Sequence, residues 1–439
     1  MTKHPAAAPS PSSAQTSSQH DATCTYCGCL CDDIRLHVEA NQIIAAERAC
    51  PLGEQWFAAH NRPGNEPLCR VAGKPAELAA GIERAAELLL AASGPLVYGL
   101  SAASCEGQRV AVAIADRLGA TLDTPSSEVP GPVGLSLHGV GEVTCTLGEI
   151  RNRSDLVIFW RADPAQTHPR HLERYSLEPE GMFVPRGRAD RMCVVVDREP
   201  TATAALADQF VPLAADRDFE TLWTLRAIVR GMDLDPDRVL RETLTPLATW
   251  RELVHRMQQS RFGVLLFGEA LARSPGGYLN IDALFALTRD LNADTRFVCQ
   301  PLRAGQNIAG ADQVLAWQTG FPFAVNFARG YPRSGSQWSA RHMLARGEAD
   351  ALLVIGDDPR ARWTGAAAER IAEIPTIVIG SEPSETSAGA EVSIRTAPYS
   401  LSVKGTIHRL DDIAIPLRPA LKSKFPDDVA VLEMLLAAL

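Results

Sequence analysis

The sequence lacks long hydrophobic runs, an excess of positive charge and the signature motifs of several enzyme classes. Its longest apolar stretches, such as residues 352–355, have the length of core strands and fall far below the roughly 18 residues that cross a bilayer. Its 43 Lys and Arg against 52 Asp and Glu give a formal charge of −9, which argues against binding to phosphate backbones. No P-loop, GxGxxG, HExxH or Ser/His/Asp triad motif is present. We therefore expect no membrane span and no nucleic-acid partner.

The amino-terminal segment lacks the features of an export signal. Residues 1–22 are rich in Ser, Ala, Pro and Gln, with no apolar core and no twin arginine, so we expect a disordered tail on a cytoplasmic protein. The whole chain is 46% apolar and 22% charged, which is typical of a folded globular protein. Its 439 residues allow about three domains or one large two-lobed fold.

Cysteine is unevenly distributed along the chain. Five of the ten cysteines fall between positions 24 and 50, and in a reducing compartment such crowding indicates a metal rather than disulfides. Cys24, Cys27 and Cys31 have the spacing CxxCxxxC, and Cys50 stands before a proline further along, a pattern by which iron–sulfur clusters are often bound. The same thiolates suit a tetrahedral zinc ion, and an empty site is the third alternative. Cys29 lies inside the loop, where we expect it to pack rather than to bind metal.

After a Cys-rich module, placed at residues 23–72, short apolar runs alternate with amphipathic stretches. Fully apolar runs of this length are typical of parallel strands covered on both faces. The predicted fold class is α/β, with doubly wound lobes at 73–215 and 261–439, a helical insertion at 216–260 between them, and a carboxyl-terminal segment within the second lobe. The predicted strands are 95–100, 155–160, 192–196, 263–268, 295–300, 350–355 and 376–379, and the predicted helices include 76–92, 105–118, 278–291 and 366–374.

Three pairs of similar motifs suggest an internal duplication. They are Gly99 with Gly268, Asp163-Pro164 with Asp358-Pro359, and Glu199-Pro200-Thr201 with Glu382-Pro383-Ser384. Each motif follows a predicted strand, although βα turns favour Gly, Asp and Pro in any case. In two duplicated lobes, a ligand is expected between them, at the carboxyl ends of both sets of strands.

The pattern Cys24-x-x-Cys27-Gly-x-x-Cys31-Asp-Asp-Ile, followed by Cys50-Pro-Leu-Gly, resembles the start of a known family. The chain is similar, over nearly its whole length past the tail, to the B subunit of formylmethanofuran dehydrogenase, a relative of molybdopterin- and tungstopterin-dependent formate dehydrogenases. Its tail and composition look more like the bacterial version, the B subunit of the formyltransferase/hydrolase complex. The resemblance also rests on residues 99–106, 168–176, 186–191, 196–204, 317–320 and 329–333.

The resemblance implies a molybdopterin-oxidoreductase fold and several site residues. In the family, a cysteine after the strand that matches residues 96–100 ligates molybdenum or tungsten, held by a bis-pterin guanine dinucleotide, and Cys105 matches that cysteine. Arg273 matches the family's active-site arginine, and Asp197 resembles the acidic residue that holds the guanine. The metal-bearing enzymes follow the cysteine with His, whereas this chain has Glu106. The segment from Cys31 to Cys105 is also short for wrapping so large a cofactor.

The implied function is that of the B subunit in a formyltransferase/hydrolase complex of tetrahydromethanopterin-linked one-carbon metabolism. Such a complex moves a formyl group from tetrahydromethanopterin to a methanofuran-type carrier and releases formate, with the chemistry and the carrier on its A, C and D subunits. Glu106 favours a non-redox scaffold. The alternative is an active redox enzyme with molybdenum or tungsten on Cys105 and a [4Fe–4S] cluster on Cys24, Cys27, Cys31 and Cys50. A zinc-stapled interaction protein is a third interpretation.

Overall fold

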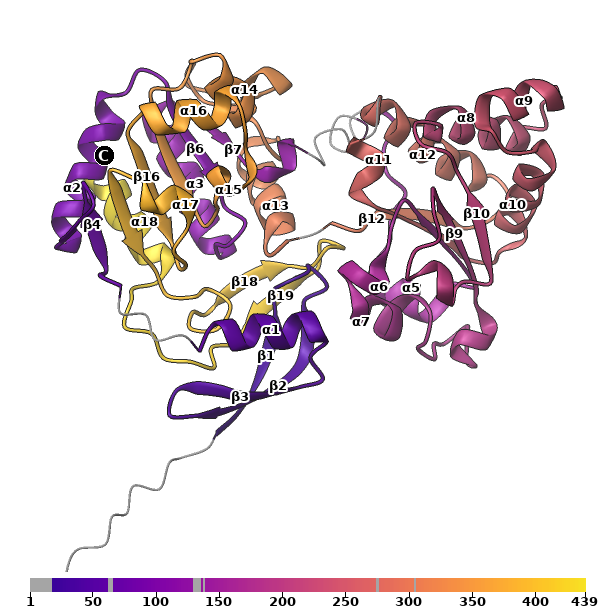
Figure 1. Cartoon of the computed structure of the whole chain (residues 1–439), viewed down its shortest axis with the longest axis horizontal. Helices are drawn as coiled ribbons and strands as arrows, with labels where there is room; N and C mark the ends of the chain where they lie inside the picture. The colour runs from indigo at the N-terminus through magenta and orange to yellow at the C-terminus, as the bar shows by residue number, and fades with distance from the viewer. Residues whose placement is uncertain (1–17, 62–65, 129–135, 137–138, 274–275, 304) are drawn as a thin grey trace, which may run out of the picture.

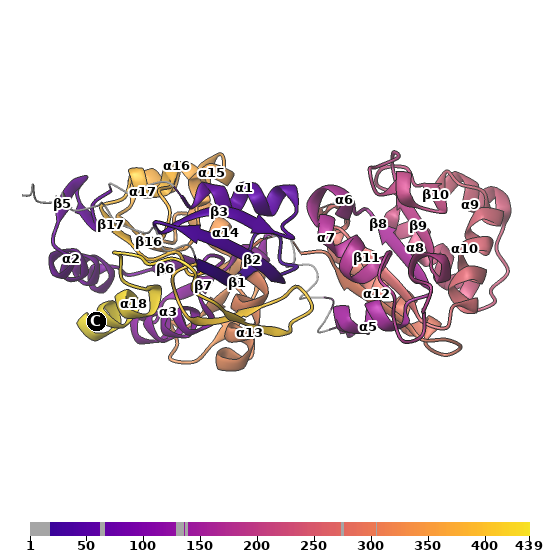
Figure 2. The same ribbon diagram turned by 90° about the horizontal axis from the view of Figure 1, so that it is seen from below.

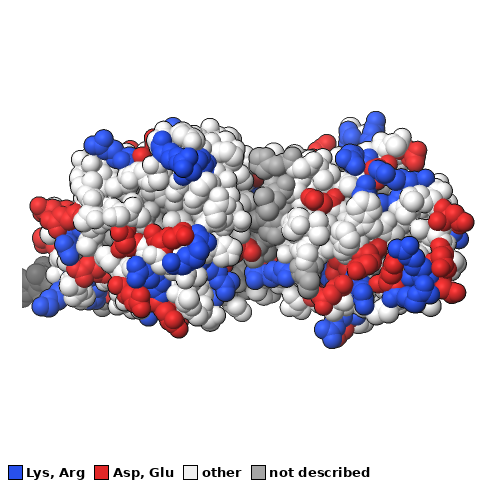
Figure 3. All heavy atoms as spheres, turned by 90° about the horizontal axis from the view of Figure 1, so that it is seen from above, with Lys and Arg blue, Asp and Glu red and all other residues white. Residues whose placement is uncertain are grey.

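The computed structural model of the chain describes residues 18–61, 66–128, 136, 139–273, 276–303 and 305–439. Two α/β lobes lie side by side, and a smaller Cys-rich module lies beneath the first of them (Figure 1). Seen from below, the module crosses the underside of the first lobe and reaches toward α6 and α7 of the second (Figure 2). Seen from above, positive and negative side chains are interspersed over both lobes (Figure 3).

The Cys-rich module is an antiparallel sheet with one helix. It consists of β1 (Ser18–Cys24), β2 (Cys31–Glu39), β3 (Gln42–Glu47) and α1 (Pro51–Ala59). The alternation of buried and exposed side chains explains why this segment forms β2. Ile34, Leu36 and Val38 are buried, whereas Arg35 is exposed. Residues 18–22 thus belong to a strand, which corrects the expectation of a disordered tail there. Residues 1–17 lie outside the described part of the chain.

The first lobe is built on a nine-stranded sheet with the order β14-β13-β7-β6-β15-β16-β17-β4-β5. The strands from β7 to β17 in that order are parallel, and those at both edges are antiparallel. The strands β6 and β15 are buried along their whole length, as expected for uninterrupted apolar runs in a parallel sheet. The bounds are β4 (Cys69–Val71), β5 (Lys74–Ala76), β6 (Pro95–Gly99), β7 (Thr121–Asp123), β13 (Val325–Asn326), β14 (Arg333–Ser334), β15 (Ala351–Ile355), β16 (Thr376–Gly380) and β17 (Val392–Arg395).

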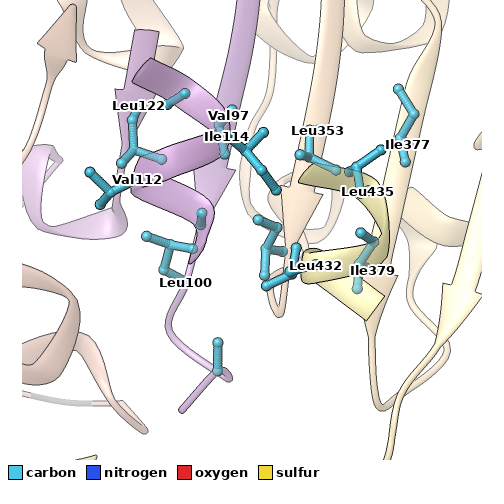
Figure 4. Close-up of a cluster of buried hydrophobic side chains, with 14 of the residues drawn as sticks. Val97, Leu100, Val112, Ile114, Leu122, Leu353, Ile377, Ile379, Leu432 and Leu435 are labelled. Atoms are coloured by element: carbon cyan, nitrogen blue, oxygen red, sulfur yellow. The ribbon is translucent and has the colours of Figure 1, made fainter. Parts of the chain in front are cut away.

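Helices cover both faces of this sheet. On one face Leu432 and Leu435 of α18 pack beside Leu353 and Ile377 of the strands, and α2, α3 and α13 join the same core (Figure 4). On the other face α14 and α16 pack against β6 and its neighbours. The helices of this lobe are α2 (Leu78–Ala91), α3 (Cys105–Leu118), α13 (Ile308–Thr319), α14 (Ala340–Ala345), α15 (Pro359–Arg362), α16 (Ala366–Glu373), α17 (Glu385–Ala388) and α18 (Asp428–Ala438).

The second lobe is built on a parallel sheet with the order β10-β9-β8-β11-β12. Helices α8, α9, α10 and α12 share one core with this sheet, and the first three fall within the predicted helical insertion. The core on the other face continues into the Cys-rich module. The elements are α5 (Leu147–Arg153), β8 (Leu156–Trp160), α6 (Pro164–Thr167), α7 (Pro169–His171), a π turn (Leu172–Ser176), β9 (Met192–Asp197), β10 (Gln209–Pro212), α8 (Asp218–Val229), α9 (Pro236–Thr243), α10 (Leu247–Gln259), β11 (Gly263–Phe267), α11 (Glu269–Arg273), α12 (Gly277–Leu291) and β12 (Phe297–Pro301).

A hairpin of β18 (Gly405–His408) and β19 (Ala414–Leu417) joins the module to the first lobe. Leu30 of the module shares a small core with Ile407 and Leu417 of this hairpin. Short 3-10 segments complete the fold at Pro125–Ser127, Gly187–Asp190, Ala204–Leu206 and Ser336–Trp338. No helix in the described ranges is both long enough and apolar enough to cross a membrane.

The two lobes interleave along the chain. The chain forms β6 and β7 in the first lobe, then β8 through β12 in the second lobe, and returns to the first lobe at α13. The predicted boundaries at 73–215 and 261–439 differ from this arrangement, because β6 pairs with β15 and β8 pairs with β11. Apolar runs identify strands but carry no information on which strands pair. The three pairs of similar motifs noted in the sequence follow strands at matching positions in the two sheets. These strand pairs are β6 and β11, β15 and β8, and β16 and β9.

Candidate functional site

The Cys-rich module places three cysteines at one end of its sheet. Cys24 ends β1, Cys31 begins β2, and the two residues are paired across the strands. The loop between them carries Cys27 and turns through Gly28, whose φ of +80° favours glycine. A Cβ on Gly28 would lie 3.2 Å from the carbonyl oxygen of Arg303. The cysteine loop therefore packs against the segment that leads from the second lobe back to the first.

Cys50 reaches the same place from α1. It is the N-cap of that helix, and its Sγ accepts a hydrogen bond from the backbone N–H of Gly53 at 3.5 Å. A Cβ on Gly53 would lie 3.5 Å from the Sγ of Cys24 and 3.8 Å from the Sγ of Cys50. Gly53 therefore sits beside both sulfur atoms, and the four expected metal ligands gather in one region.

Two arginines of the second lobe lie against this region. Arg170 donates to the two carboxylate oxygens of Asp33 at 2.7 and 2.8 Å, and Arg174 donates to Asp32 at 2.9 Å. Asp32 and Asp33 directly follow Cys31 in β2. The ion pairs therefore place two guanidinium groups near the thiol of Cys31 and join the module to the second lobe.

The cysteines of the loop differ in their protonation. Burial raises the pKa of Cys31 to about 11, although the charges of Arg170 and Arg174 oppose that rise. The pKa of Cys27 is lowered to about 7, first by its hydrogen bond with the side chain of Cys29 and further by Arg170. A thiol with a pKa near neutrality supplies the thiolate that binds metal. Cys29 is fully buried, in keeping with the packing role expected for it.

The donor atoms of the four cysteines limit which metal groups the module could hold. Within the described ranges, no three His, Cys, Asp or Glu side chains converge closely enough to hold one metal ion. Zinc needs four ligands about 2.1–2.3 Å from a single ion, whereas a [4Fe–4S] cluster is bound through four separate irons and spreads its thiolates further apart. The all-sulfur set of Cys24, Cys27, Cys31 and Cys50 has the donor chemistry of both a [4Fe–4S] cluster and a tetrahedral zinc site. Such a cluster, when bound, supplies one-electron transfer.

Cys105 lies in a different setting, at the first turn of α3. Its side chain is buried, with 4% exposure, and its Sγ lies 3.3 Å from Nδ1 of His408 on β18. Asn307 donates its side-chain N–H to the same sulfur at 3.6 Å. Burial raises the pKa of Cys105 to about 12, so this thiol stays protonated at neutral pH. Glu106 is also engaged, because it accepts hydrogen bonds from the backbone and side chain of Thr406 at 2.9 and 2.8 Å.

A cavity of about 390 Å³ lies between the two lobes. We name it the interlobe cavity; its walls include Ser101, Gly268, Pro301 and Asp357, at or just beyond the carboxyl ends of β6, β11, β12 and β15. This is where doubly wound sheets bind ligands. Arg273 also lines it.

A partly buried polar network closes one wall of the interlobe cavity. Arg362 forms an ion pair with Asp357 at 2.6 Å and donates to the Tyr98 hydroxyl at 2.9 Å. Glu128 accepts hydrogen bonds from Tyr98 at 2.5 Å and from the Trp363 indole at 3.0 Å. Burial, together with the charges of Asp357 and Glu128, holds the pKa of Tyr98 well above its ordinary value. These groups satisfy one another, so this wall is polar and ordered.

A second cavity, of about 440 Å³, separates the Cys-rich module from the first lobe. Thr25 and Trp56 line it from the module, and Tyr399 and Asp358 from the lobe. It shares Ser101, Gln306, Asp357 and Arg362 with the interlobe cavity. The two cavities therefore adjoin along a common wall.

Comparison with known proteins identifies relatives over most of the chain, although no protein-family model matches it. The B subunit of tungsten-containing formylmethanofuran dehydrogenase 2 from Methanocaldococcus jannaschii is 38% identical over 405 residues, which are 91% of this chain and 92% of that protein. The protein of the same name from Methanococcus maripaludis is 34% identical over 425 residues, 95% of this chain and 97% of that one. The chain belongs to the family of formylmethanofuran dehydrogenase B subunits.

A bacterial B subunit is also similar to this chain. The B subunit of the formyltransferase/hydrolase complex Fhc from Methylorubrum extorquens is 30% identical over 346 residues, 77% of this chain and 87% of that protein. A chain in the crystal structure of that FhcABCD complex with methylofuran superposes with a TM-score of 0.70 at 25% identity, covering 84% of this chain and 98% of that one. Acetylene hydratase from Pelobacter acetylenicus superposes with a TM-score of 0.71, covering 96% of this chain and 69% of that one. At 11% identity this last likeness shows a shared fold alone.

The residues of this family member do not fit a molybdenum or tungsten centre on Cys105. Neither cavity is lined by Cys105, whose sulfur is already in contact with His408 and Asn307. A protein thiolate must face the metal that it binds, and the sulfur of Cys105 faces His408 and Asn307 instead. The volume of the interlobe cavity, about 390 Å³, lies in the range of roughly 300–1,000 Å³ that suits a single drug-sized ligand.

The other two expected site residues lie apart from each other. Arg273, in α11, lines the interlobe cavity with a side chain that is 64% exposed and pairs with Glu269 at 3.2 Å. Asp197 ends β9 and lies 3.6 Å from Arg161, away from the walls of both cavities. The structure thus brings Arg273 to the interlobe cavity but brings neither Asp197 nor Cys105 to it.

Several residues of the site have partners that are distant in the sequence. Arg170 and Arg174 lie in the stretch 168–176 that resembles the family, but nothing local shows that Arg170 pairs with Asp33, 137 positions earlier, or Arg174 with Asp32, 142 positions earlier. Glu128 and Arg362 of the cavity wall are also far from each other in the sequence. The local signal for the two arginine pairs was Asp32-Asp33 beside Cys31, since two adjacent carboxylates favour cations nearby.

Proposed function

We propose that this chain is the B subunit of a formyltransferase/hydrolase complex and that it serves there as a non-redox scaffold. In this role it assembles with the A, C and D subunits, which transfer the formyl group from tetrahydromethanopterin to a methanofuran-type carrier and release formate. The similarity to the B subunit of Fhc over 87% of that protein supports the assignment. The observation that carries the scaffold role is Cys105, enclosed by His408 and Asn307 at 4% exposure.

The Cys-rich module has a structural part in this proposal. A [4Fe–4S] cluster on Cys24, Cys27, Cys31 and Cys50 ties the β1–β2 loop to the start of α1, and the ion pairs of Arg170 and Arg174 tie the same loop to the second lobe. The cluster thereby holds the module in place between the two lobes.

The net charge and the free cysteines bear on two further parts of the proposal, the lack of a nucleic-acid partner and the cytoplasmic location. The net charge of −9 and the interspersed charges of the upper face (Figure 3) argue against nucleic acid as a partner. All ten cysteines are free, which suits the reducing cytoplasm. In this proposal the carrier is contacted by the other three proteins of the complex.

An active redox enzyme is the second candidate. Two relatives at 38% and 34% identity are tungsten-containing enzymes, and all five cysteines that such an enzyme would use are present. In that case Cys105 would have to turn out of its contact with His408 and lose a proton. The enclosed state of the thiol favours the scaffold.

Elemental analysis separates the two candidates. We expect the complex, purified without oxygen, to contain iron but neither molybdenum nor tungsten, and to release formate from the formylated carrier. Molybdenum or tungsten near one atom per chain would instead establish the redox enzyme. Failure of the chain to co-purify with the A, C and D subunits would overturn both candidates.

A further inference from the structure

Three neighbouring strands of the second lobe are each preceded by an arginine. Arg153 ends α5 ahead of β8, Arg261 stands before β11, and Arg296 stands before β12. Since β8, β11 and β12 are adjacent and parallel, the three arginines meet at the amino edge of the sheet, opposite to the edge that lines the interlobe cavity. They surround a hollow of about 130 Å³ whose other walls are Phe183 and Phe262.

The charge of this hollow is only partly balanced. Arg261 forms an ion pair with Asp155 at 3.1 Å, and the same carboxylate accepts the backbone N–H groups of Arg261 and Phe262 at 3.0 Å. Arg153 lies over the ring of Phe183, with 5.4 Å from guanidinium to centroid. Among the described residues, neither Arg153 nor Arg296 forms an ion pair, and no acid lines the hollow. The site therefore attracts a carboxylate.

Two exposed apolar side chains, which we call the apolar tip, lie beside the arginines. Met182 is 78% exposed and Phe183 is 50% exposed. Their backbone is fixed, because Phe183 donates its N–H to the carbonyl of Asn152 at 2.9 Å and Met182 donates to the Asn152 side chain at 3.2 Å. Gly181 allows this approach, since a Cβ there would lie 2.2 Å from the carbonyl oxygen of Arg151. Rigid exposed Met and Phe side chains among arginines have the composition of a protein interface.

A broad depression continues from the other side of Met182. Its volume is about 730 Å³, and Arg151, Arg174 and Arg409 line it together with the acids Asp32 and Glu180. A chain that places a carboxylate in the hollow can therefore cross Met182 and continue along this depression, where Arg174 and Arg409 are already paired with Asp32 and Asp411. This path suits an extended peptide more than a compact ion.

We infer that Arg153, Met182, Phe183, Arg261 and Arg296 form the docking site for an acidic segment of a partner protein within the complex. One or more carboxylates of the segment enter the arginine hollow, and its apolar side chains cover Met182 and Phe183. The apolar tip distinguishes such a segment from a free anion, which would leave Met182 and Phe183 in water. The identification of the partner with the A, C or D subunit rests on the proposed function.

Co-expression with the A, C and D subunits tests the inference. We expect the double variant Arg153→Glu with Arg296→Glu, and separately Phe183→Ser, to weaken assembly at least about tenfold, as loss of an interface anchor does. Arg238→Glu with Arg241→Glu, exposed on α9, makes the same charge change elsewhere and leaves assembly unaltered. Assembly is measured by sedimentation of the purified complex at increasing salt, which should weaken the wild type more than the double variant.

A photo-crosslinking residue in place of Phe183 gives an independent result that does not depend on loss of binding. We expect it to capture a peptide of one of the other three proteins, and that peptide to contain Asp or Glu. Capture of a peptide without acids, capture of nucleic acid, or undiminished assembly of both hollow variants refutes the docking site while leaving the proposed function in place. A wild-type chain that fails to assemble refutes the proposed function instead.

Discussion

The thiols of the Cys-rich module and the thiol of Cys105 show how differently one fold can treat the same side chain. The hydrogen bond with the side chain of Cys29, and to a smaller extent the charge of Arg170, lowers the pKa of Cys27 to about 7. Cys105 lies in an apolar core beside His408, with a pKa raised to about 12. Burial raises the pKa of Cys24 and Cys31 as it raises that of Cys105, so the two sites differ in geometry: the module gathers several thiols at one end of a hairpin, whereas the sulfur of Cys105 contacts His408 and Asn307. A cysteine that matches a metal ligand in sequence is therefore not by itself an available ligand.

The largest expected effect comes from the module. Cys27→Ser replaces a soft thiolate by a hydroxyl and should abolish the cluster, because three thiolates and a neutral hydroxyl hold iron poorly. We expect iron content and visible absorbance to fall to background in the anaerobically purified protein. Cys193→Ala, which removes a fully buried cysteine from β9, is the matched control and should keep its iron. An unchanged spectrum in Cys27→Ser would refute the cluster.

The next effect concerns the arginine that joins the module to the second lobe. Arg170→Gln removes the closer of the two arginine partners of Asp33 and leaves Arg174 at 3.4 Å, and we expect the free energy of unfolding to fall by about 3 kcal/mol, as for other broken, largely buried ion pairs. The side chain of Arg170 is only 9% exposed. Arg273→Gln breaks an exposed pair and should cost less than about 1 kcal/mol. Equal losses in the two variants, measured by denaturant unfolding, would contradict this assignment of the pairs.

A smaller effect is expected at the other thiol. Cys105→Ala removes a buried sulfur from its contact with His408 and should lower the free energy of unfolding by about 1–2 kcal/mol. Metal content and formate release by the assembled complex should stay within about twofold, because no step of the scaffold role uses this thiol. A loss of tungsten or molybdenum together with activity would place the metal on Cys105 after all.

The smallest effect is a pH dependence near the interlobe cavity. Burial raises the pKa of Asp123 from 3.8 to about 6, although hydrogen bonds from Ala340, Ser127 and Ala324 oppose the rise. The folded state therefore binds the proton more tightly than the unfolded state, and this stabilisation is lost as the pH rises through about 6. We expect Asp123→Asn to remove about 1 kcal/mol of the change in unfolding free energy between about pH 5 and about pH 8. An identical pH profile in the variant would show that Asp123 does not titrate there.

The secondary structure follows closely from local patterns. Each predicted strand overlaps an observed one, from β6 at Pro95–Gly99 to β16 at Thr376–Gly380. The apolar runs suffice because strands covered on both faces tolerate few polar residues. Helix α3 begins at Cys105 and ends at Leu118, as its periodicity predicts, between the cap Ser104 and the left-handed Gly119. Strand pairing did not follow from these patterns, since any buried strand can pair with any other of similar length.

Local spacing alone established the most specific feature of this protein, the set of Cys24, Cys27 and Cys31 within a single hairpin. Ligands so close in the chain are brought together by one turn, so no distant contact is needed. The state of Cys105 depended on the tertiary fold, because its partners Asn307 and His408 are 202 and 303 residues away. The interleaved lobes and the three arginines at one sheet edge arose in the same way, from pairing between strands that the chain separates. Residue spacing and hydrophobic periodicity determine local structure. Burial, charge balance and the exposure of a thiol depend on the packing of the whole tertiary structure.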